Sequence, residues 1–235
     1  MDPQPIRLVI FDCDGVLVDS EGIALEVLVE ALAETGIGLT TNEAAERFLG
    51  RSLGSLTEVV RSEFGVEIDP AFLAGMRDRL YARFRAELAA LPGVASAIDS
   101  LKAMQVSCCV ASSSQRERIE LSLSVTGLLP RLSPHIFSAT MVERGKPAPD
   151  LFLHAAAEMG VAPAQCIVIE DSPAGIRAAQ AAGMKVIAFT GGSHTGNASY
   201  REALTHLKPD GQFDAMENLL HFARGARRPE DLTDA

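Results

Sequence analysis

Short runs of apolar, mostly β-branched residues recur along the chain, and each run stops abruptly at a cluster of polar residues or glycines. Runs without a polar face are typical of strands that are buried on both sides, as in a parallel sheet. They predict strands at residues 6–11, 105–111, 166–169 and 185–189, and a weaker run predicts one at residues 135–138.

Between these runs, apolar residues recur at spacings of three and four, which is the period of an amphipathic helix. Pro149 and Pro173 stand where two such helices would begin, and Gly160 and Gly183 stand where they would end. Alternating strands and helices predict an α/β fold, a Rossmann-like doubly wound parallel sheet. The helices predicted here lie at residues 94–104, 115–125, 150–159 and 174–182.

Residues 19–90 break this alternation, because they contain helical patterns and no convincing strand. We therefore expect two domains: an α/β core of residues 1–18 and 91–235, and an all-helical cap domain of residues 19–90. The cap would be inserted after the first strand and pack over the end of the sheet. Its predicted helices lie at residues 21–35, 41–49, 53–64 and 70–88.

Charge and cysteine content narrow the classes of function. The formal net charge is −10 and the pI is near 5.0, which disfavours nucleic acids and anionic membrane surfaces as partners. No apolar segment approaches the roughly 20 residues of a membrane helix, and the N-terminal residues lack a signal-peptide pattern. The four cysteines have no metal-type or redox-type spacing, so we expect a reducing compartment, the cytoplasm.

Ligands of open parallel sheets bind beyond the carboxyl ends of the strands, so the residues at these strand tips matter most. The first predicted strand ends at Asp12, Asp14 follows two residues later, and Gly15 permits a tight turn that aims both carboxylates at one point. Such a pair suggests either a metal site or an acid/base couple, and a carboxylate can also attack phosphorus as a nucleophile. A solvated turn or a helix cap is the alternative.

Three other places along the chain carry candidate chemistry. Glu170 and Asp171 follow the third strand, and Asp171 could share a magnesium ion with Asp12, because hard cations prefer oxygen ligands. The serine cluster 112–114 follows the second strand and would cradle an anion. Lys146, in a loop, could neutralise a phosphoryl group. The alternatives are helix capping for the acids and serines, and a solvated surface charge for the lysine.

The order of these features resembles the haloacid dehalogenase-like hydrolases, in the branch that has a helical cap inserted after the first strand. The resemblance covers nearly the whole chain, and four motifs in the family's order make a chance match improbable. The segments that carry it are residues 11–20 (FDCDGVLVDS), 110–114 (VASSS), 145–150 (GKPAPD) and 169–175 (IEDSPAG).

The resemblance implies a magnesium-dependent phosphatase that acts on a small phosphorylated metabolite. Asp12 would attack the phosphorus, and Asp14 would protonate the leaving alcohol and then activate the hydrolytic water. Ser112 and Lys146 would hold the phosphoryl oxygens. The Mg²⁺ ligands implied by the family are Asp12, the backbone carbonyl of Asp14, Glu170 and Asp171.

Substrate binding is expected at Ser113 and Ser114 and, within the cap, at Arg51, whose loop is where the family places its substrate-selecting residues. A solvated arginine is the alternative for Arg51. The likeness is greatest to phosphatases of sugar phosphates or phosphorylated sugar acids. We expect a monomer or weak homodimer that binds neither nucleic acid nor membrane.

Two rival functions remain on this fold. A β-phosphoglucomutase-like mutase is disfavoured, because Ala24 and Leu53 stand nearest the positions of that branch's histidine and arginine. A catalytically inactive binding or regulatory protein is the second rival, and the intact set of candidate residues argues against it. Within the family, Asp14 favours phosphoryl transfer over carbon–halogen cleavage, and the absence of lysine from residues 19–90 disfavours a Schiff-base hydrolase.

Overall fold

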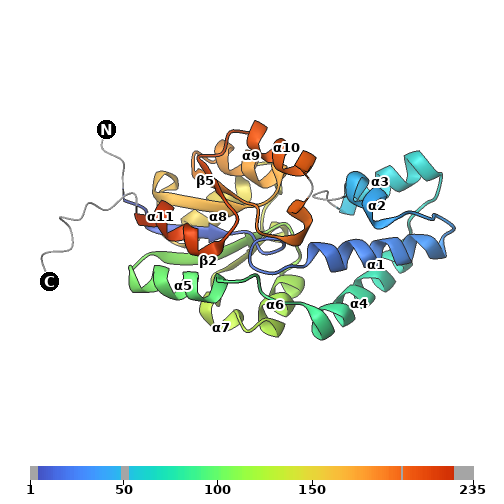
Figure 1. Cartoon of the computed structure of the whole chain (residues 1–235), viewed down its shortest axis with the longest axis horizontal. Helices are drawn as coiled ribbons and strands as arrows, with labels where there is room; N and C mark the ends of the chain where they lie inside the picture. Colours follow the sequence, from blue (N-terminus) through green and yellow to red (C-terminus); the bar gives the residue numbers. More distant parts are fainter. Residues whose placement is uncertain (1–4, 49–52, 197, 225–235) are drawn as a thin grey trace, which may run out of the picture.

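The computed structural model of the chain describes residues 5–48, 53–196 and 198–224. Its described residues form one sheet, covered by helices (Figure 1). The six strands of this sheet are parallel and follow the order β3-β2-β1-β4-β5-β6. This order is that of a doubly wound fold, so the predicted fold class is confirmed. The strands are β1 (Leu8–Phe11), β2 (Ser107–Ser112), β3 (Ile136–Ser138), β4 (Cys166–Glu170), β5 (Lys185–Phe189) and β6 (Gly211–Phe213).

Successive residues of the central strands point to opposite faces of the sheet, and both faces are apolar. Val9 and Phe11 of β1 join one buried cluster, while Leu8 and Ile10 join the other. The first face is covered by α5 (Val94–Ala103), α6 (Arg116–Val125), α7 (Leu129–Leu132) and α11 (Leu219–Arg224). The second face is covered by α8 (Asp150–Glu158), α9 (Pro173–Ala181) and α10 (Ala198–His206). Continuous apolar runs are needed in β1 and β4 because both faces of these strands are buried.

The boundary of β2 differs from the sequence prediction. The strand begins at Ser107 rather than at Gln105, because Gln105 has a left-handed backbone with φ of 59°. This residue ends the turn after α5, where Val106 N–H still donates to the carbonyl of Leu101 at 2.9 Å. The apolar run at residues 105–111 therefore contains the end of the turn after α5 and the start of β2.

Several short elements carry no strong pattern and were missing from the sequence prediction. β6 has three residues and α7 has four, too few for a period to emerge. The helices α10 and α11 were also not predicted, and single turns of 3₁₀ helix complete the described chain. These turns are η1 (Ala139–Met141), η2 (Pro163–Gln165), η3 (Ser193–Gly196) and η4 (Met216–Asn218).

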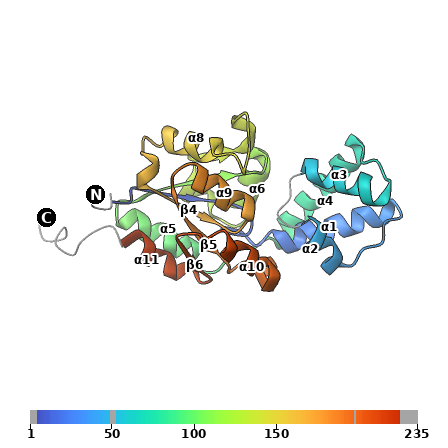
Figure 2. The same cartoon turned by 90° about the horizontal axis from the view of Figure 1, so that it is seen from above.

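The four helices between β1 and α5 form a separate lobe at one end of the sheet, called here the helical insertion (Figures 1 and 2). The lobe has a buried cluster of its own that includes Leu32, Phe48 and Val60. Its helices are α1 (Glu21–Glu34), α2 (Thr41–Phe48), α3 (Leu53–Phe64) and α4 (Pro70–Glu87).

The two chain crossings between the core and the insertion run side by side. Asp19 N–H donates to Ala89 O at 3.1 Å, and Leu91 N–H donates to Leu17 O at 3.0 Å. Phe84 of α4 also belongs to the buried cluster on the first face of the sheet, so the apolar core continues into the insertion. The division into a core and a cap of residues 19–90 therefore remains our proposal. No helix among the described residues is long and apolar enough to cross a membrane.

Candidate active site

The candidate site lies where the sheet changes winding direction. β1 sits between β2 and β4, and the chain winds from it to one side and later returns to the other. Phe11 of β1 is paired in register with Ile169 of β4, so the residues that follow these strands emerge together. Asp12 is therefore brought beside Glu170 and Asp171, at the kind of crevice where open α/β sheets bind ligands.

The side chain of Lys146 brings a positive charge to this edge of the sheet. Its Nζ donates to Asp12 Oδ1 at 2.6 Å, to Glu170 Oε1 at 2.6 Å and to the carbonyl of Ala111 at 2.9 Å. Only 3% of its side chain is exposed, and the ammonium lies over the ring of Phe152. The surface-charge interpretation of Lys146 is thus excluded by burial and by three hydrogen bonds.

Three buried carboxylates meet at the site. Asp12, Glu170 and Asp171 each offer an oxygen, and these atoms all lie within 4.8 Å of one another. Burial raises the pKa of Asp12 and of Asp171 well above 3.8, and the charge of Glu170 raises both further, against the effect of Lys146. One ammonium cannot neutralise three carboxylates. An all-oxygen donor set with this charge fits a hard divalent cation.

Two glycines make room for the carboxylates. A Cβ on Gly15, whose φ is +76°, would collide with the carboxylate of Asp171. A Cβ on Gly175 would collide with the carboxylate of Glu170. The backbone therefore approaches both acids more closely than any other residue type would permit.

The loop after β4 fixes the orientation of Glu170. Its Oε2 accepts from the N–H groups of Asp171 and Ser172 and from the hydroxyl of Ser172, at 2.9–3.1 Å. Ser172, rather than Asp171, caps α9 by accepting from Gly175 N–H at 3.0 Å. Asp171 is therefore free of the capping role that was its alternative.

Asp14 occupies a different environment from Asp12. Its Oδ1 accepts from Ser20 Oγ at 2.6 Å and from Arg118 Nη2 at 2.9 Å, and its Oδ2 accepts from Ser114 Oγ at 2.7 Å. Burial favours the neutral acid, but the charge of Arg118 and these hydrogen bonds together hold the pKa of Asp14 below 3.8. The two acids of one motif thus have pKa values shifted in opposite directions, which is typical of residues with separate roles.

The remaining predicted residues are distributed as follows. Ser112 is buried at the tip of β2, and its Oγ accepts from Ser114 N–H at 3.2 Å. Ser113 is exposed, while the hydroxyl of Ser114 is bound to Asp14. Arg51 lies outside the described residues.

Three residues of this site had no role in the sequence prediction. Ser20 lies within the first motif, and Arg118 follows the serine cluster by one helical turn. His194 lies in the loop after β5, with Nε2 2.9 Å from Asp171 Oδ2 but without hydrogen-bond geometry. Burial lowers the pKa of His194, which favours the neutral ring. A search for polar residues after the strand predicted at residues 185–189, which is β5, would have found His194.

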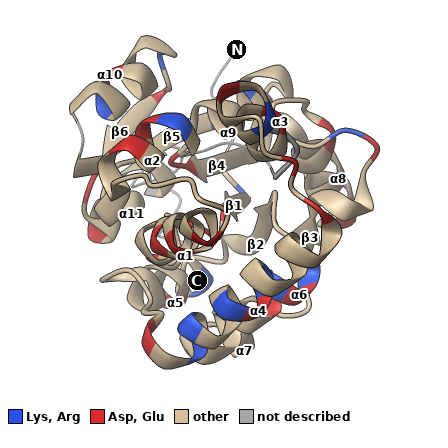
Figure 3. Cartoon of the chain, turned by 90° about the vertical axis from the view of Figure 1, so that its right-hand side faces the viewer, with Lys and Arg blue, Asp and Glu red and all other residues tan. Residues whose placement is uncertain are grey.

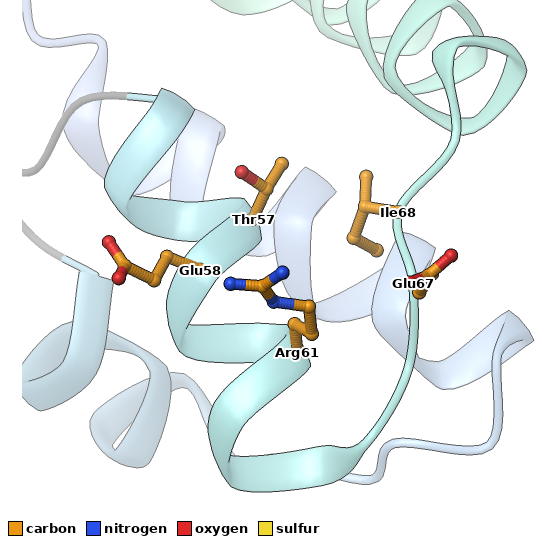
Figure 4. A pocket seen from close by; sticks show the side chains of 5 residues that line it. All are labelled: Thr57, Glu58, Arg61, Glu67 and Ile68. Carbon is orange, nitrogen blue, oxygen red and sulfur yellow. The ribbon is translucent and has the colours of Figure 1, made fainter.

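A hollow of about 420 Å³ lies elsewhere, on the helical insertion (Figure 4). Its walls contain none of the residues predicted for the site, and no group of metal-binding acids was found there among the described residues. Buried, converging ionisable groups are a stronger sign of catalysis than concavity, so we assign the site to the sheet edge. The hollow is lined by Thr57, Glu58, Arg61, Glu67 and Ile68.

The fold and the acid cluster together define a doubly wound α/β enzyme with three buried carboxylates at its switch point. The profile of the haloacid dehalogenase-like hydrolases matches residues 9–189, and the chain belongs to this family. The resemblance stated from the sequence is therefore confirmed.

Three known proteins resemble the chain over most of their own length. A 6-phosphogluconate phosphatase of Escherichia coli is 34% identical over 190 residues, which cover 80% of this chain and 85% of that protein. A conserved haloacid dehalogenase-like protein of unknown function from Agrobacterium tumefaciens has 38% identity and a TM-score of 0.82, with 94% and 98% of the chains covered. A hydrolase of this family from Deinococcus radiodurans, solved with bound phosphate and sodium, has 34% identity and a TM-score of 0.77, covering 98% and 99%. These likenesses confirm the predicted enzyme class, a phosphoric monoester hydrolase.

Proposed function

We propose that the protein is a Mg²⁺-dependent phosphatase that hydrolyses a small phosphorylated metabolite through a phospho-aspartate on Asp12. The observation that carries this proposal is the buried cluster in which Lys146 joins Asp12 to Glu170, with Asp171 completing a group of oxygen ligands. A nucleophile, a charge-neutralising lysine and a cation site at one point are the parts that phosphoryl transfer needs.

The reaction would proceed in two displacements. An oxygen of Asp12 attacks the phosphorus and the bond to the leaving alcohol breaks. Asp14 gives that alcohol its proton, so Asp14 has to enter this step protonated, against the charge of Arg118 that lowers its pKa. Water then attacks the phosphorus of the acyl phosphate and passes a proton to Asp14, so that Asp12 is released as a carboxylate. Lys146 and Ser112 are proposed to hold the phosphoryl oxygens during both steps.

The metal requirement follows from the charge of the cluster. Asp12 must be ionised to attack, whereas burial and its acidic neighbours raise its pKa. When bound, Mg²⁺ would offset this repulsion and neutralise charge on the phosphoryl group. We propose Asp12, Glu170, Asp171 and the backbone carbonyl of Asp14 as its protein ligands.

The substrate class is proposed from the relatives. A 6-phosphogluconate phosphatase is among them, and phosphate is bound in the Deinococcus structure. We therefore propose a sugar phosphate or phosphorylated sugar acid as substrate, with the cytoplasm as compartment and a monomer or weak homodimer as the assembly. A mutase is the rival function. Ala24 stands nearest the position of that branch's histidine and Leu53 nearest that of its arginine, which supports hydrolysis over isomerisation.

The test is a panel of phosphorylated metabolites that includes 6-phosphogluconate, assayed for free phosphate with Mg²⁺ and with excess EDTA. We expect release of phosphate with Mg²⁺ and none with EDTA. Asp12→Asn should lower turnover by more than about 10³-fold, because the nucleophile is lost. The matched control is Asp99→Asn, which changes an exposed aspartate paired with Arg131.

Full turnover in EDTA would refute the metal requirement, and an active Asp12→Asn variant would refute the nucleophile. Isomerisation is followed separately by incubating β-glucose 1-phosphate with a trace of the 1,6-bisphosphate. Glucose 6-phosphate formed faster than free phosphate would favour the mutase instead.

A further inference from the structure

The three donors to Asp14 leave its two oxygens unequal. A carboxylate oxygen has two lone-pair positions, so Oδ1, which accepts from Ser20 and Arg118, has both occupied. Oδ2 accepts only from Ser114 in the described structure and keeps one position free. A proton can therefore be carried only on Oδ2 without breaking one of these bonds.

Arg118 is held in place from the side of the helical insertion. Its guanidinium lies over the ring of Phe84, 5.3 Å from the ring centroid, and Phe84 is 1% exposed. Phe84 belongs to α4 and Arg118 to α6, and these helices lie side by side (Figure 3). Arg118 Nε is buried and has no hydrogen-bond partner among the described residues. The ring and the ion pair with Asp14 are thus the contacts that orient the guanidinium.

We propose that Arg118 is a positioning residue for proton transfer by Asp14. Arg118 and Ser20 together occupy both lone-pair positions of Asp14 Oδ1, so the transferred proton must pass through Oδ2. The ring of Phe84 holds the guanidinium of Arg118 in this position. Arg118 donates to Asp14 directly, so the role proposed for it acts through Asp14. The proposal rests on the proposed phosphatase function, because it needs Asp14 to protonate a leaving group.

This role predicts a dependence on the leaving group. A p-nitrophenolate is stable enough to leave without a proton. A phenolate depends more strongly on protonation by the enzyme, and an alkoxide depends on it most strongly. Positioned proton transfer typically contributes ~10²–10⁴-fold in rate, and misplacing the acid loses a part of it. A residue that only stabilised the fold would lower all three rates alike.

The experiment measures kcat/KM with Mg²⁺ for p-nitrophenyl phosphate, phenyl phosphate and glycerol 2-phosphate. Arg118→Met keeps the length of the side chain and removes its donors. We expect kcat/KM to fall about 10- to 100-fold for glycerol 2-phosphate and less than about threefold for p-nitrophenyl phosphate, with KM nearly unchanged. Arg118→Lys keeps a charged donor and should recover most of the loss.

Two variants serve as comparisons. Arg116→Met changes an arginine two positions earlier on the same helix that pairs with Glu120 at 2.7 Å, and it should leave all three rates unchanged. Phe84→Leu removes the ring while keeping the site apolar, and it should reproduce the leaving-group dependence at smaller size. Because it leaves Arg118 intact, it also provides the test if Arg118→Met does not fold.

The outcomes separate this inference from the proposed function. If the unmodified protein releases no phosphate from any ester, both fail together. If it is active and Asp14→Asn shows the leaving-group dependence, but Arg118→Met and Phe84→Leu lower all three rates equally or not at all, only the role of Arg118 is overturned.

Discussion

Acids and basic residues crowd two regions of the molecule, the acid cluster at the sheet edge and the α1–α4 face of the helical insertion. On the insertion, Arg83 contacts Glu26 at 2.8 Å and also reaches Glu30 and Glu87, with its side chain 30% exposed. At the sheet edge, Lys146 is shared between Asp12 and Glu170 and is almost completely buried. The two regions contain similar residue types but differ in their exposure to solvent.

The comparison teaches that burial, rather than the presence of ion pairs, distinguishes a reactive cluster from a solvated one. Exposed pairs gain little because water and salt screen them. Buried charges cost desolvation energy that pairing only partly returns, so a buried excess of acid weakens the fold. The cost in desolvation energy at the sheet edge fits the cation and phosphoryl group that we propose to bind there.

The largest effect is expected from Lys146→Met. It leaves three buried acids without the cation that joins two of them, and removing one partner of a buried pair typically costs about 3–5 kcal/mol. Urea unfolding at pH 8 in EDTA measures this loss, and Mg²⁺ should restore part of it. Lys102→Met, at an exposed lysine of α5, is the control. An unchanged free energy of unfolding in EDTA would show that the cluster does not depend on Lys146.

An intermediate effect is expected from Glu21→Gln, at the junction of the two regions. Burial and the charges of Asp14 and Asp171 raise the pKa of Glu21 from 4.5 to about 7. The folded state therefore binds this proton more tightly than the unfolded state, so stability is lost as pH rises from about 4.5 to 7. Glutamine cannot ionise, and relative to the unmodified protein it should gain on the order of 2 kcal/mol between pH 5 and pH 8.

This difference is measured by urea unfolding of both proteins at pH 5 and pH 8 in EDTA. Glu34→Gln is the matched control on the same helix, because Arg79 lowers the pKa of the exposed Glu34 and it stays ionised across this range. A constant difference between Glu21→Gln and the unmodified protein at both pH values would contradict the raised pKa.

The smallest effect is expected from Arg83→Gln on the insertion. Its pairs are exposed, so we expect a small fall in Tm at low salt, largely gone at about 1 M salt, where charges are screened within ~3 Å. The kcat and KM values should not change. A loss of stability as large as that of Lys146→Met would remove the contrast between the two regions.

The sequence predicted the acids and the lysine because each stands at a strand tip or in a motif of fixed order. Asp12 and Glu170 stand at the ends of apolar runs of the kind typical of buried strands. The environment of Asp14 could not be predicted, because Arg118 is 104 positions away and its approach depends on how α6 packs beside α4. His194 was not predicted either, because the strand before it, β5, ends without acidic residues. The residues at the strand ends are thus predictable from the local sequence pattern. The residues that hydrogen-bond to them, such as Arg118, depend on how the helices pack.

The paired chain crossings have a consequence for how such an enzyme can be built. Because Leu91 N–H already bonds to Leu17 O, the ends of the core on either side of the insertion meet in space. At the level of the backbone, the insertion is therefore a closed loop whose two ends are adjacent in the core. Its length and shape can change without altering the distance the core must span. Changes in the insertion away from Phe84, whose ring contacts Arg118, can therefore leave the spacing of the acid cluster unaltered.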